Sequence, residues 1–544
     1  MKSFGTGCAL AVTVVIALTI VFRVPSCAES FWIDELHSAW AVSDGFADVA
    51  QRAAIGNQTT GYFHLLWVWS ALLGQGEVAM RLSSVLISAL TAGVLVVAVA
   101  RQTGRVAGGW IAGGIFAVDP NAIFFGCELR PYALVMLCAV LATWSLSIWI
   151  GTPCGQGLSS GGLWHSFAGA RWRLAMLFWI CVAALVHPTS LGVLWLWVPL
   201  GLVIAWKRNR LTLWRADAVA AVLVAATLVS LALSSLPSSW AHRDQWRAFG
   251  QATTWWQLWY AWDWVPIVLM PLAAALLLGL LGWIVGRQGR NAAAAEPIDR
   301  AIQADVVVWA APAIVALLGT LVFFVASYFQ WVPLWHRRYY VAALPLLAWS
   351  SGALVAGGIN SLQRGWAGRI WNAWGPSLVG GLVAIALIGF QLWYQGTLAT
   401  LSAGQMPLHL RGERWREAVQ LVRAERNPAD PVWLDSGLIE ADFFHRPVGE
   451  TDPIQPEQWD YLAFPLRGPY PLDNVLVVSS GEADSWMQQH LATLPPSATT
   501  VWLVTRSGQQ SVQRYLSRLD QQRPVQASVR QAGRIAVLKL QFRD

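Results

Sequence analysis

Residues 82–100 read LSSVLISALTAGVLVVAVA and contain no charged side chain. A helix of about 20 apolar residues spans the hydrocarbon core of a bilayer and satisfies its own backbone hydrogen bonds there. Ten further apolar stretches lie near residues 8–24, 107–126, 132–150, 173–189, 190–206, 216–236, 265–286, 305–329, 339–358 and 374–394. The sequence therefore predicts an α-helical polytopic membrane protein with about eleven transmembrane helices.

The amino-acid composition agrees with a membrane protein. Of the 544 residues, 56% are hydrophobic and 12% are charged, whereas charged residues make up about 25% of soluble domains. A soluble enzyme, a disordered chain and a fibrous repeat are thereby excluded. The net charge of +7 does not indicate nucleic-acid binding, because residues 1–395 hold 22 basic and 14 acidic side chains, placed mostly in loops between the apolar stretches.

Most of the basic side chains lie in one set of loops, which is every second loop along the chain. They are Lys2; Arg101 and Arg105; Arg171 and Arg173; Lys207, Arg208, Arg210 and Arg215; Arg287, Arg290 and Arg300; Arg364 and Arg369. Because cytoplasmic loops are enriched in Lys and Arg, we expect a cytoplasmic N-terminus in the plasma or inner membrane. The first loop, residues 25–81, and everything after residue 395 are then extracytoplasmic. A cleaved signal peptide at residues 1–28 is the alternative to a first crossing.

The chain loses its apolar character after residue 395. Helical patterns at 413–426, 483–494 and 511–521 alternate with strand patterns at 431–434, 475–478, 501–505, 525–530 and 535–542. Such alternation is typical of an α/β fold. We therefore predict a transmembrane domain at residues 1–395 and an extracytoplasmic α/β domain at residues 396–544. A short apolar stretch at 62–73 in the first loop predicts a helix in the membrane interface.

Two adjacent acids, Asp34 and Glu35, follow the first crossing in the segment FWIDELH, residues 31–37. Partial desolvation near a bilayer surface keeps a carboxylate basic, so that it can accept a proton from a hydroxyl nucleophile. Asp34 and Glu35 are therefore candidate catalytic residues. A pair of solvated loop acids is the alternative interpretation.

The segment ELRPY, residues 128–132, places Glu128, Arg130 and Tyr132 where the fourth crossing begins, on the same side of the membrane. Ionisable groups at membrane depth usually face a cavity or a partner. A structural Glu128–Arg130 pair and a functional one are equally compatible with this position.

The segment HRRYY, residues 336–340, places His336, Arg337 and Arg338 on that side as well. Two arginines there run against the bias towards cytoplasmic basic residues. Guanidinium forks match phosphate oxygens, so one of these arginines is a candidate ligand of a lipid-linked phosphate. Binding to ordinary anionic headgroups is the alternative.

Arg81 opens the second crossing, and His187 joins the fifth crossing to the sixth, again on the extracytoplasmic side. For His187, a structural histidine is the alternative to a functional one. The histidines show no metal-ligand spacing along the sequence, which leaves the metal question open. Walker, Rossmann, His-Glu-x-x-His and Cys-x-x-Cys motifs do not occur, so a phosphate-bearing substrate must be held without those devices.

Taken together, these segments resemble the GT-C superfamily of polyprenyl-phosphate-sugar-dependent glycosyltransferases. That superfamily includes protein O-mannosyltransferases and the enzymes that add aminoarabinose to lipid A. The resemblance covers about residues 8–360 and, more loosely, RWREA at 414–418, and it rests on the order of several motifs on one side of the membrane. The motifs are the Asp34-Glu35 pair, GEVAMRLSSV at 76–85, ELRPYAL at 128–134, HPT at 187–189, and RYY at 338–340 with LP at 344–345.

The resemblance implies an inverting transfer of a sugar from a polyprenyl-phosphate donor to a hydroxyl of a lipid, glycan or protein. Asp34 would deprotonate the acceptor, or coordinate a divalent metal ion that positions it, and Glu35 would orient Asp34 or the sugar. Arg337 or Arg338, helped by Arg130, would bind the departing phosphate. No other cofactor is implied.

The remaining candidates are expected to line the same pocket: Glu128, Tyr132, His187, Arg81 and His336. A flippase or transporter of lipid-linked sugars is the alternative function, since it also requires buried charges and a basic extracytoplasmic patch. Alternating access, however, places a transport site near the bilayer midplane between internal repeats. The candidates here gather on one face instead.

Overall fold

The structure is a computed structural model that describes residues 2–56, 58–151, 163–208, 215–233, 250–287, 296–365, 375–404, 411–438, 456–478, 491, 494, 499–506 and 508–542. The chain divides into two compact units, each of which is described by itself. The membrane unit consists of residues 1–25 and 82–409. The α/β unit consists of residues 26–81 and 410–544.

The helices before residue 234 are α1 (Lys2–Arg23), η1 (Val24–Ala28), α2 (Ile33–Ala41), α3 (Val49–Ile55), α4 (Thr60–Leu73), α5 (Glu77–Thr103), α6 (Val106–Val118), α7 (Pro120–Cys127), α8 (Tyr132–Gly151), α9 (Leu163–Val186), η2 (Pro188–Ser190), α10 (Leu191–Leu194), α11 (Trp197–Lys207) and α12 (Arg215–Leu233). Between residues 250 and 404 lie α15 (Trp256–Trp259), η4 (Val265–Leu269), α16 (Met270–Arg287), α17 (Glu296–Tyr328), η6 (Arg337–Tyr339), α18 (Ala343–Gly365), α19 (Gly375–Tyr394) and α20 (Thr397–Ser402).

Within the described ranges, nine helical segments are long and apolar enough to cross a membrane, and α6 with α7 forms a bent tenth. The nine are Gly5–Ala28, Glu77–Thr103, Tyr132–Gly151, Pro188–Lys207, Arg215–Leu233, Val265–Gly286, Val306–Tyr328, Ala343–Arg364 and Ser377–Tyr394. These ten coincide with ten of the eleven predicted crossings. The prediction of a polytopic helical membrane protein is thereby confirmed.

The one remaining predicted crossing is the fifth along the chain, at residues 173–189. It falls on α9, which is not among these candidate spans. Two charged side chains, Arg171 and Arg173, lie near the middle of α9. Arg173 pairs with Asp217 of α12, with Nε 2.7 Å from Oδ1. The apolar remainder of α9 is shorter than the roughly 20 residues that cross a bilayer.

The third predicted crossing, at residues 107–126, is not one uninterrupted helix. α6 and α7 meet at an angle of 66°. Asp119 between them is extended, with ψ 128°, as is usual for a residue before proline. Its Oδ1 accepts a hydrogen bond of 2.9 Å from the Ala122 amide and so caps α7, which begins at Pro120.

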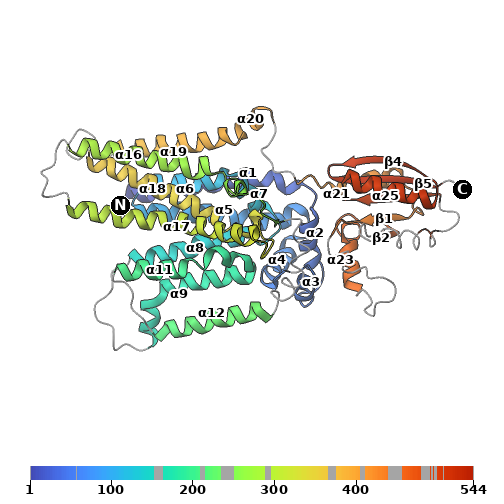
Figure 1. Cartoon of the computed structure of the whole chain (residues 1–544), viewed down its shortest axis with the longest axis horizontal. Coiled ribbons are helices and arrows are strands. Elements are labelled where there is room, and N and C mark those ends of the chain that lie inside the picture. Colours follow the sequence, from blue (N-terminus) through green and yellow to red (C-terminus); the bar gives the residue numbers. More distant parts are fainter. Residues whose placement is uncertain are drawn as a thin grey trace. The chain divides into compact units, whose positions relative to one another are not determined.

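The membrane unit packs around α18. This helix contacts α6, α8, α16, α17 and α19, and Figure 1 shows it among them. The approach of α18 to α6 depends on small residues, because a Cβ on Gly352 would lie 2.3 Å from the Gly108 oxygen. Close helix contacts of this kind are typical of membrane proteins.

The α/β unit contains a five-stranded sheet with the order β2-β1-β3-β5-β4. The strands are β1 (Val432–Asp435), β2 (Val475–Val477), β3 (Thr500–Thr505), β4 (Val525–Ala532) and β5 (Ile535–Phe542), and the helices after residue 410 are α21 (Trp415–Glu425), α23 (Pro456–Arg467) and α25 (Gln509–Gln522). The strand β1 is parallel to β2 and β3, whereas β5 is antiparallel to β3 and β4. Figure 1 shows the strands of this sheet as arrows, together with α21 and α25.

The core of the sheet is apolar because inward-facing side chains of three strands and α25 meet there. Trp433, Leu503, Leu538 and Leu519 are buried in one cluster. All five predicted strands are present, and the predicted helices at 413–426 and 511–521 correspond to α21 and α25. Most of the predicted helix at 483–494 lies outside the described residues.

The first loop folds within the α/β unit. Helix α2 contacts α3 and α23, and Trp40 of α2 donates a hydrogen bond of 2.8 Å from Nε1 to Asp460 Oδ2 of α23. His37 of α2 lies edge-on to Tyr461, with ring centroids 5.2 Å apart. The short helix predicted at 62–73 corresponds to α4, and Leu65 and Leu72 on it are exposed.

Candidate active site

Asp34 lies in the first turn of α2, and the local sequence fixes where that helix begins. Trp32 is extended, with φ −88° and ψ 171°, and its amide donates a hydrogen bond of 3.3 Å to Glu35 Oε2. A glutamate three residues after the capping position is the reciprocal half of a capping box. Asp34 is partly exposed, whereas Glu35 is fully buried. Of the two predicted catalytic acids, Asp34 is therefore the more accessible.

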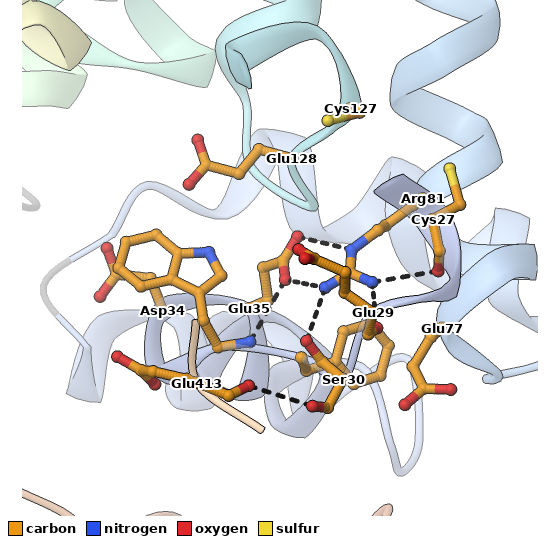
Figure 2. Close-up of polar contacts among 12 residues, drawn as sticks. Cys27, Glu29, Ser30, Asp34, Glu35, Glu77, Arg81, Cys127, Glu128 and Glu413 are labelled. Atoms are coloured by element: carbon orange, nitrogen blue, oxygen red, sulfur yellow. Dashed lines mark hydrogen bonds and ion pairs between the residues drawn. The ribbon is translucent and has the colours of Figure 1, made fainter. Parts of the chain in front are cut away.

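Glu35 forms a buried ion pair with Arg81, and neither side chain is exposed. Arg81 donates from Nε to Glu35 Oε1 at 2.9 Å and from Nη2 to Glu35 Oε2. Figure 2 shows this pair, with Asp34 on the far side of Glu35 from Arg81. A bidentate guanidinium–carboxylate pair fixes orientation as well as distance.

Arg81 also donates to three backbone carbonyls. Nη1 reaches the Cys27 oxygen at 3.1 Å and the Glu29 oxygen, while Nη2 reaches the Ser30 oxygen at 3.1 Å. The guanidinium lies 5.1 Å from the centre of the Phe31 ring. Arg81 and Glu35 therefore fasten residues 27–35 to the start of α5.

A second group of candidates meets in the membrane unit around His187. The His187 ring lies edge-on to Tyr132 at 5.5 Å and is stacked with Tyr339 at 6.5 Å. Arg338 stacks on Tyr339, with its Cζ 5.0 Å from the ring centre, and His336 lies 6.3 Å from Tyr339. Three segments that are far apart in sequence thus supply one aromatic and basic cluster.

Tyr339 lies at the centre of this cluster, although the charge pattern of the sequence does not single it out. Its sequence signal is the tyrosine pair that directly follows the two arginines. The hydroxyl of Tyr339 accepts a hydrogen bond of 3.1 Å from Arg338 Nη2. Tyr339 therefore orients the Arg338 guanidinium at the cluster.

Glu128 and Arg130 lie buried in the turn between α7 and α8. The Arg130 amide donates to the Glu128 oxygen at 2.8 Å, and Ser84 Oγ of α5 donates to the same oxygen at 2.6 Å. The charges of Arg130 and Arg338 both act on the His187 ring. His187 is 8% exposed, and its Nε2 has no hydrogen-bond partner within the described part of the chain. Two positive charges and a buried ring nitrogen are therefore close together in the membrane unit.

Arg337 has different surroundings from its neighbour. Its Nε donates to the Ala261 oxygen at 3.0 Å, its Nη1 to Asn121 Oδ1 at 2.8 Å, and its Nη2 to the Tyr260 oxygen at 2.7 Å. Each guanidinium nitrogen thus has a neutral protein acceptor. Arg337 joins α7 to the segment before η4.

The predicted site residues therefore form two groups. Asp34, Glu35 and Arg81 belong to the α/β unit, whereas the cluster around His187 belongs to the membrane unit. A single pocket that contains both groups stays a prediction. Among the residues that the structure describes, no three His, Cys, Asp or Glu side chains gather in a way that could hold a metal ion.

Comparison with solved structures identifies the fold. The chain is similar to ArnT from Cupriavidus metallidurans in the apo state, with a TM-score of 0.54 and 14% sequence identity over 99% of this chain and 98% of that one. It is also similar to the same protein bound to undecaprenyl phosphate, with a TM-score of 0.50 and 15% identity over 98% and 97% of the two chains. ArnT is a GT-C glycosyltransferase. The chain has the GT-C fold.

The GT-C fold extends over nearly the whole chain, since the similarity includes the part after residue 395. The resemblance seen in the sequence covers about residues 8–360 and, more loosely, residues 414–418 at the start of the α/β domain. No protein-family model and no curated protein matches the sequence. The likeness therefore shows the GT-C fold itself, and the activity is argued from the site.

Proposed function

We propose that this chain is an inverting glycosyltransferase that moves a sugar from a polyprenyl-phosphate donor to a hydroxyl acceptor at the extracytoplasmic face of the membrane. The GT-C fold supports this proposal, because the ArnT structure of the same fold contains undecaprenyl phosphate. The proposed acceptor is a lipid, a glycan or a protein. Residues 1–395 form the proposed transmembrane catalytic domain, and the N-terminus is cytoplasmic.

The observation that carries the proposal is the cluster of Arg130, His187 and Arg338, in which the His187 ring contacts both Tyr132 and Tyr339. Arginine forks bind phosphate oxygens, and a site with little water strengthens that interaction. Fixed positive groups also stabilise the negative charge that develops on a departing phosphate. We assign Arg130 and Arg338 to the donor phosphate, with the two tyrosines against the prenyl chain or the sugar.

Asp34 is the proposed general base. Its carboxylate accepts the proton of the acceptor hydroxyl while the hydroxyl oxygen attacks the anomeric carbon. The bond from the anomeric carbon to the phosphate oxygen breaks, and polyprenyl phosphate leaves with the electron pair. Attack opposite the leaving group inverts the anomeric configuration. Glu35 and Arg81 hold the segment on which Asp34 is carried.

Release of polyprenyl phosphate by the purified protein tests this function. We expect release from a sugar-charged polyprenyl phosphate, and we expect Asp34→Asn to abolish it, since the amide removes the base and keeps the shape. Asp48→Asn in the same loop is the matched control and should behave as wild type. Mass spectrometry of the lipid product measures both.

Two outcomes would contradict the proposal. Release by Asp34→Asn within a few-fold of wild type would remove Asp34 from the mechanism. Movement of the intact sugar-lipid across a vesicle membrane, with no polyprenyl phosphate formed, would identify a flippase instead.

A further inference from the structure

Three consecutive backbone amides just before Asp34 are each held by a side chain. The Phe31 amide donates to the Tyr470 hydroxyl at 2.7 Å, the Trp32 amide to Glu35 Oε2 at 3.3 Å, and the Ile33 amide to Glu413 Oε2 at 2.9 Å. Amides at a helix N-terminus have no partner within the helix. Two of the three partners here come from the region after residue 410.

Glu413 acts as a cap for α2 from a distant part of the chain. Ile33 is the first residue of α2, and a carboxylate at a helix N-terminus is stabilised by the helix dipole. The Glu413 side chain is 2% exposed, and its Oε1 accepts a hydrogen bond of 2.6 Å from Arg506 Nε. Its Oε2 also accepts from Trp415 Nε1 at 3.2 Å. The Glu413 carboxylate is thereby fixed on both oxygens.

The backbone at Glu413 is also held in place. Glu413 forms an antiparallel bridge with Gly533, and its carbonyl oxygen accepts a hydrogen bond of 3.0 Å from Ser30 Oγ. Arg506, which orients Glu413, follows β3 and donates to the Gly437 oxygen after β1. In α/β sheets the carboxyl ends of parallel strands commonly form ligand sites. Here that edge supplies the support for the start of α2.

Tyr470 makes the second long-range contact. Its hydroxyl accepts from the Phe31 amide and donates to Glu77 Oε1 at 2.6 Å. Burial, together with the nearby Glu77 carboxylate, raises the pKa of Tyr470, so the hydroxyl keeps the proton that it donates. Arg416 pairs with the same Glu77 oxygen at 2.5 Å. Tyr470 therefore connects the segment before Asp34 to the first turn of α5.

We infer that the region after residue 410 sets the position of Asp34, with Glu413 and Tyr470 as positioning residues for the transfer reaction. This inference rests on the proposed function, because it concerns the placement of the proposed base. A displacement of about 1 Å in a reacting group can lower a rate by about 100-fold. Neither residue touches the reacting atoms in this assignment. Their effect passes through residues 31–33.

Tyr470→Phe and Glu413→Gln in the full-length purified protein test the inference. We expect each to lower kcat for sugar transfer about tenfold or more while KM for the lipid donor stays within about twofold. We also expect faster hydrogen exchange in the peptide that covers residues 29–36. Tyr515→Phe and Glu425→Gln are the matched controls in the same region and should change neither quantity.

The controls are chosen for chemistry as well as location. Tyr515 is a buried tyrosine whose hydroxyl has no hydrogen-bond partner among the described residues. Glu425 pairs with Arg530 at 2.5 Å on a partly exposed surface. A general loss of folding would lower the melting temperature and alter exchange throughout the chain, whereas the inferred role is confined to residues 29–36.

The outcomes separate this inference from the proposed function. If Asp34→Asn is inactive but Tyr470→Phe and Glu413→Gln match their controls in kcat and exchange, only the inference is overturned. If Asp34→Asn stays active, the mechanism is overturned, and with it the positioning role. Reduced kcat with localised exchange in both variants supports the inference.

Discussion

Arg337 and Arg338 are neighbours in sequence, but their guanidinium groups face different surroundings. Arg337 donates to two backbone oxygens and to Asn121, all neutral, whereas Arg338 stacks on Tyr339 close to His187. The first arrangement fixes two segments of protein to each other. The second places a charge beside two aromatic rings. Sequence alone leaves the choice between these arginines open, because acceptor groups such as Asn121 become neighbours only in the fold.

Arg338→Ala and Arg337→Ala should therefore differ. We expect Arg338→Ala to raise KM for the lipid donor about tenfold or more, because a charge-assisted hydrogen bond contributes about 1.5–3 kcal/mol. Arg337→Ala should lower the melting temperature and leave KM nearly unchanged. Donor titrations and thermal unfolding of both variants measure this. A normal KM for Arg338→Ala would place the phosphate elsewhere.

The Arg81–Glu35 pair allows a prediction about stability. Removing one partner of a buried ion pair costs about 3–5 kcal/mol, because the other charge is left buried. Arg81→Met also leaves the carbonyls of Cys27, Glu29 and Ser30 without their donor, whereas Glu35→Gln keeps those three bonds. We expect wild type to have the highest melting temperature, Glu35→Gln a lower one and Arg81→Met the lowest. A higher melting temperature for Arg81→Met than for Glu35→Gln would show that the carbonyl contacts contribute little.

At the scale of elements, hydropathy predicts most of the helices but not their interruptions. A moving average over residues 107–126 remains apolar, so the sequence suggests one continuous crossing. The break arises from the Asp119-Pro120 pair, whose effect is local: proline disfavours a helical residue before it, and the aspartate caps the helix that begins at the proline. The five strands, in contrast, can be predicted from the sequence, because each is specified by a pattern of residues along its whole length and not by a single pair.

Asp119 offers a direct test of the cap. Asp119→Asn should be tolerated, because the amide oxygen can still accept from the Ala122 amide. Asp119→Ala should destabilise the protein by about 1 kcal/mol, with a cap loss of up to about 2 kcal/mol in some proteins. Thermal unfolding of the two variants measures the difference. Equal melting temperatures would show that Pro120 alone is enough to begin α7.

For the whole molecule, the sequence indicates a membrane part and an α/β part but does not show where the first loop belongs. The order of the chain groups residues 25–81 with the transmembrane domain. In the structure, residues 26–81 cluster with residues 410–544. Contacts such as Ile33 with Glu413 join residues 380 positions apart. No local pattern of polarity or spacing indicates a pairing of that kind.

The predicted orientation of the chain can be tested by cysteine labelling in cells. Ser528 on β4 and Lys207 at the end of α11 are both exposed. With a membrane-impermeant maleimide, we expect Ser528→Cys to react in intact cells and Lys207→Cys to react only after permeabilisation. The unsubstituted chain gives the background from the six native cysteines. Labelling of Lys207→Cys in intact cells would reverse the orientation.

The distance along the chain between Ile33 and Glu413 also matters while the protein is being made. A ribosome adds about 5–20 residues per second, so roughly 20–80 s pass between the synthesis of the two residues. During that interval the nascent first loop exists without the carboxylate that later caps it. A product that terminates early never receives that carboxylate. Order at the start of α2 therefore requires that translation has passed residue 413.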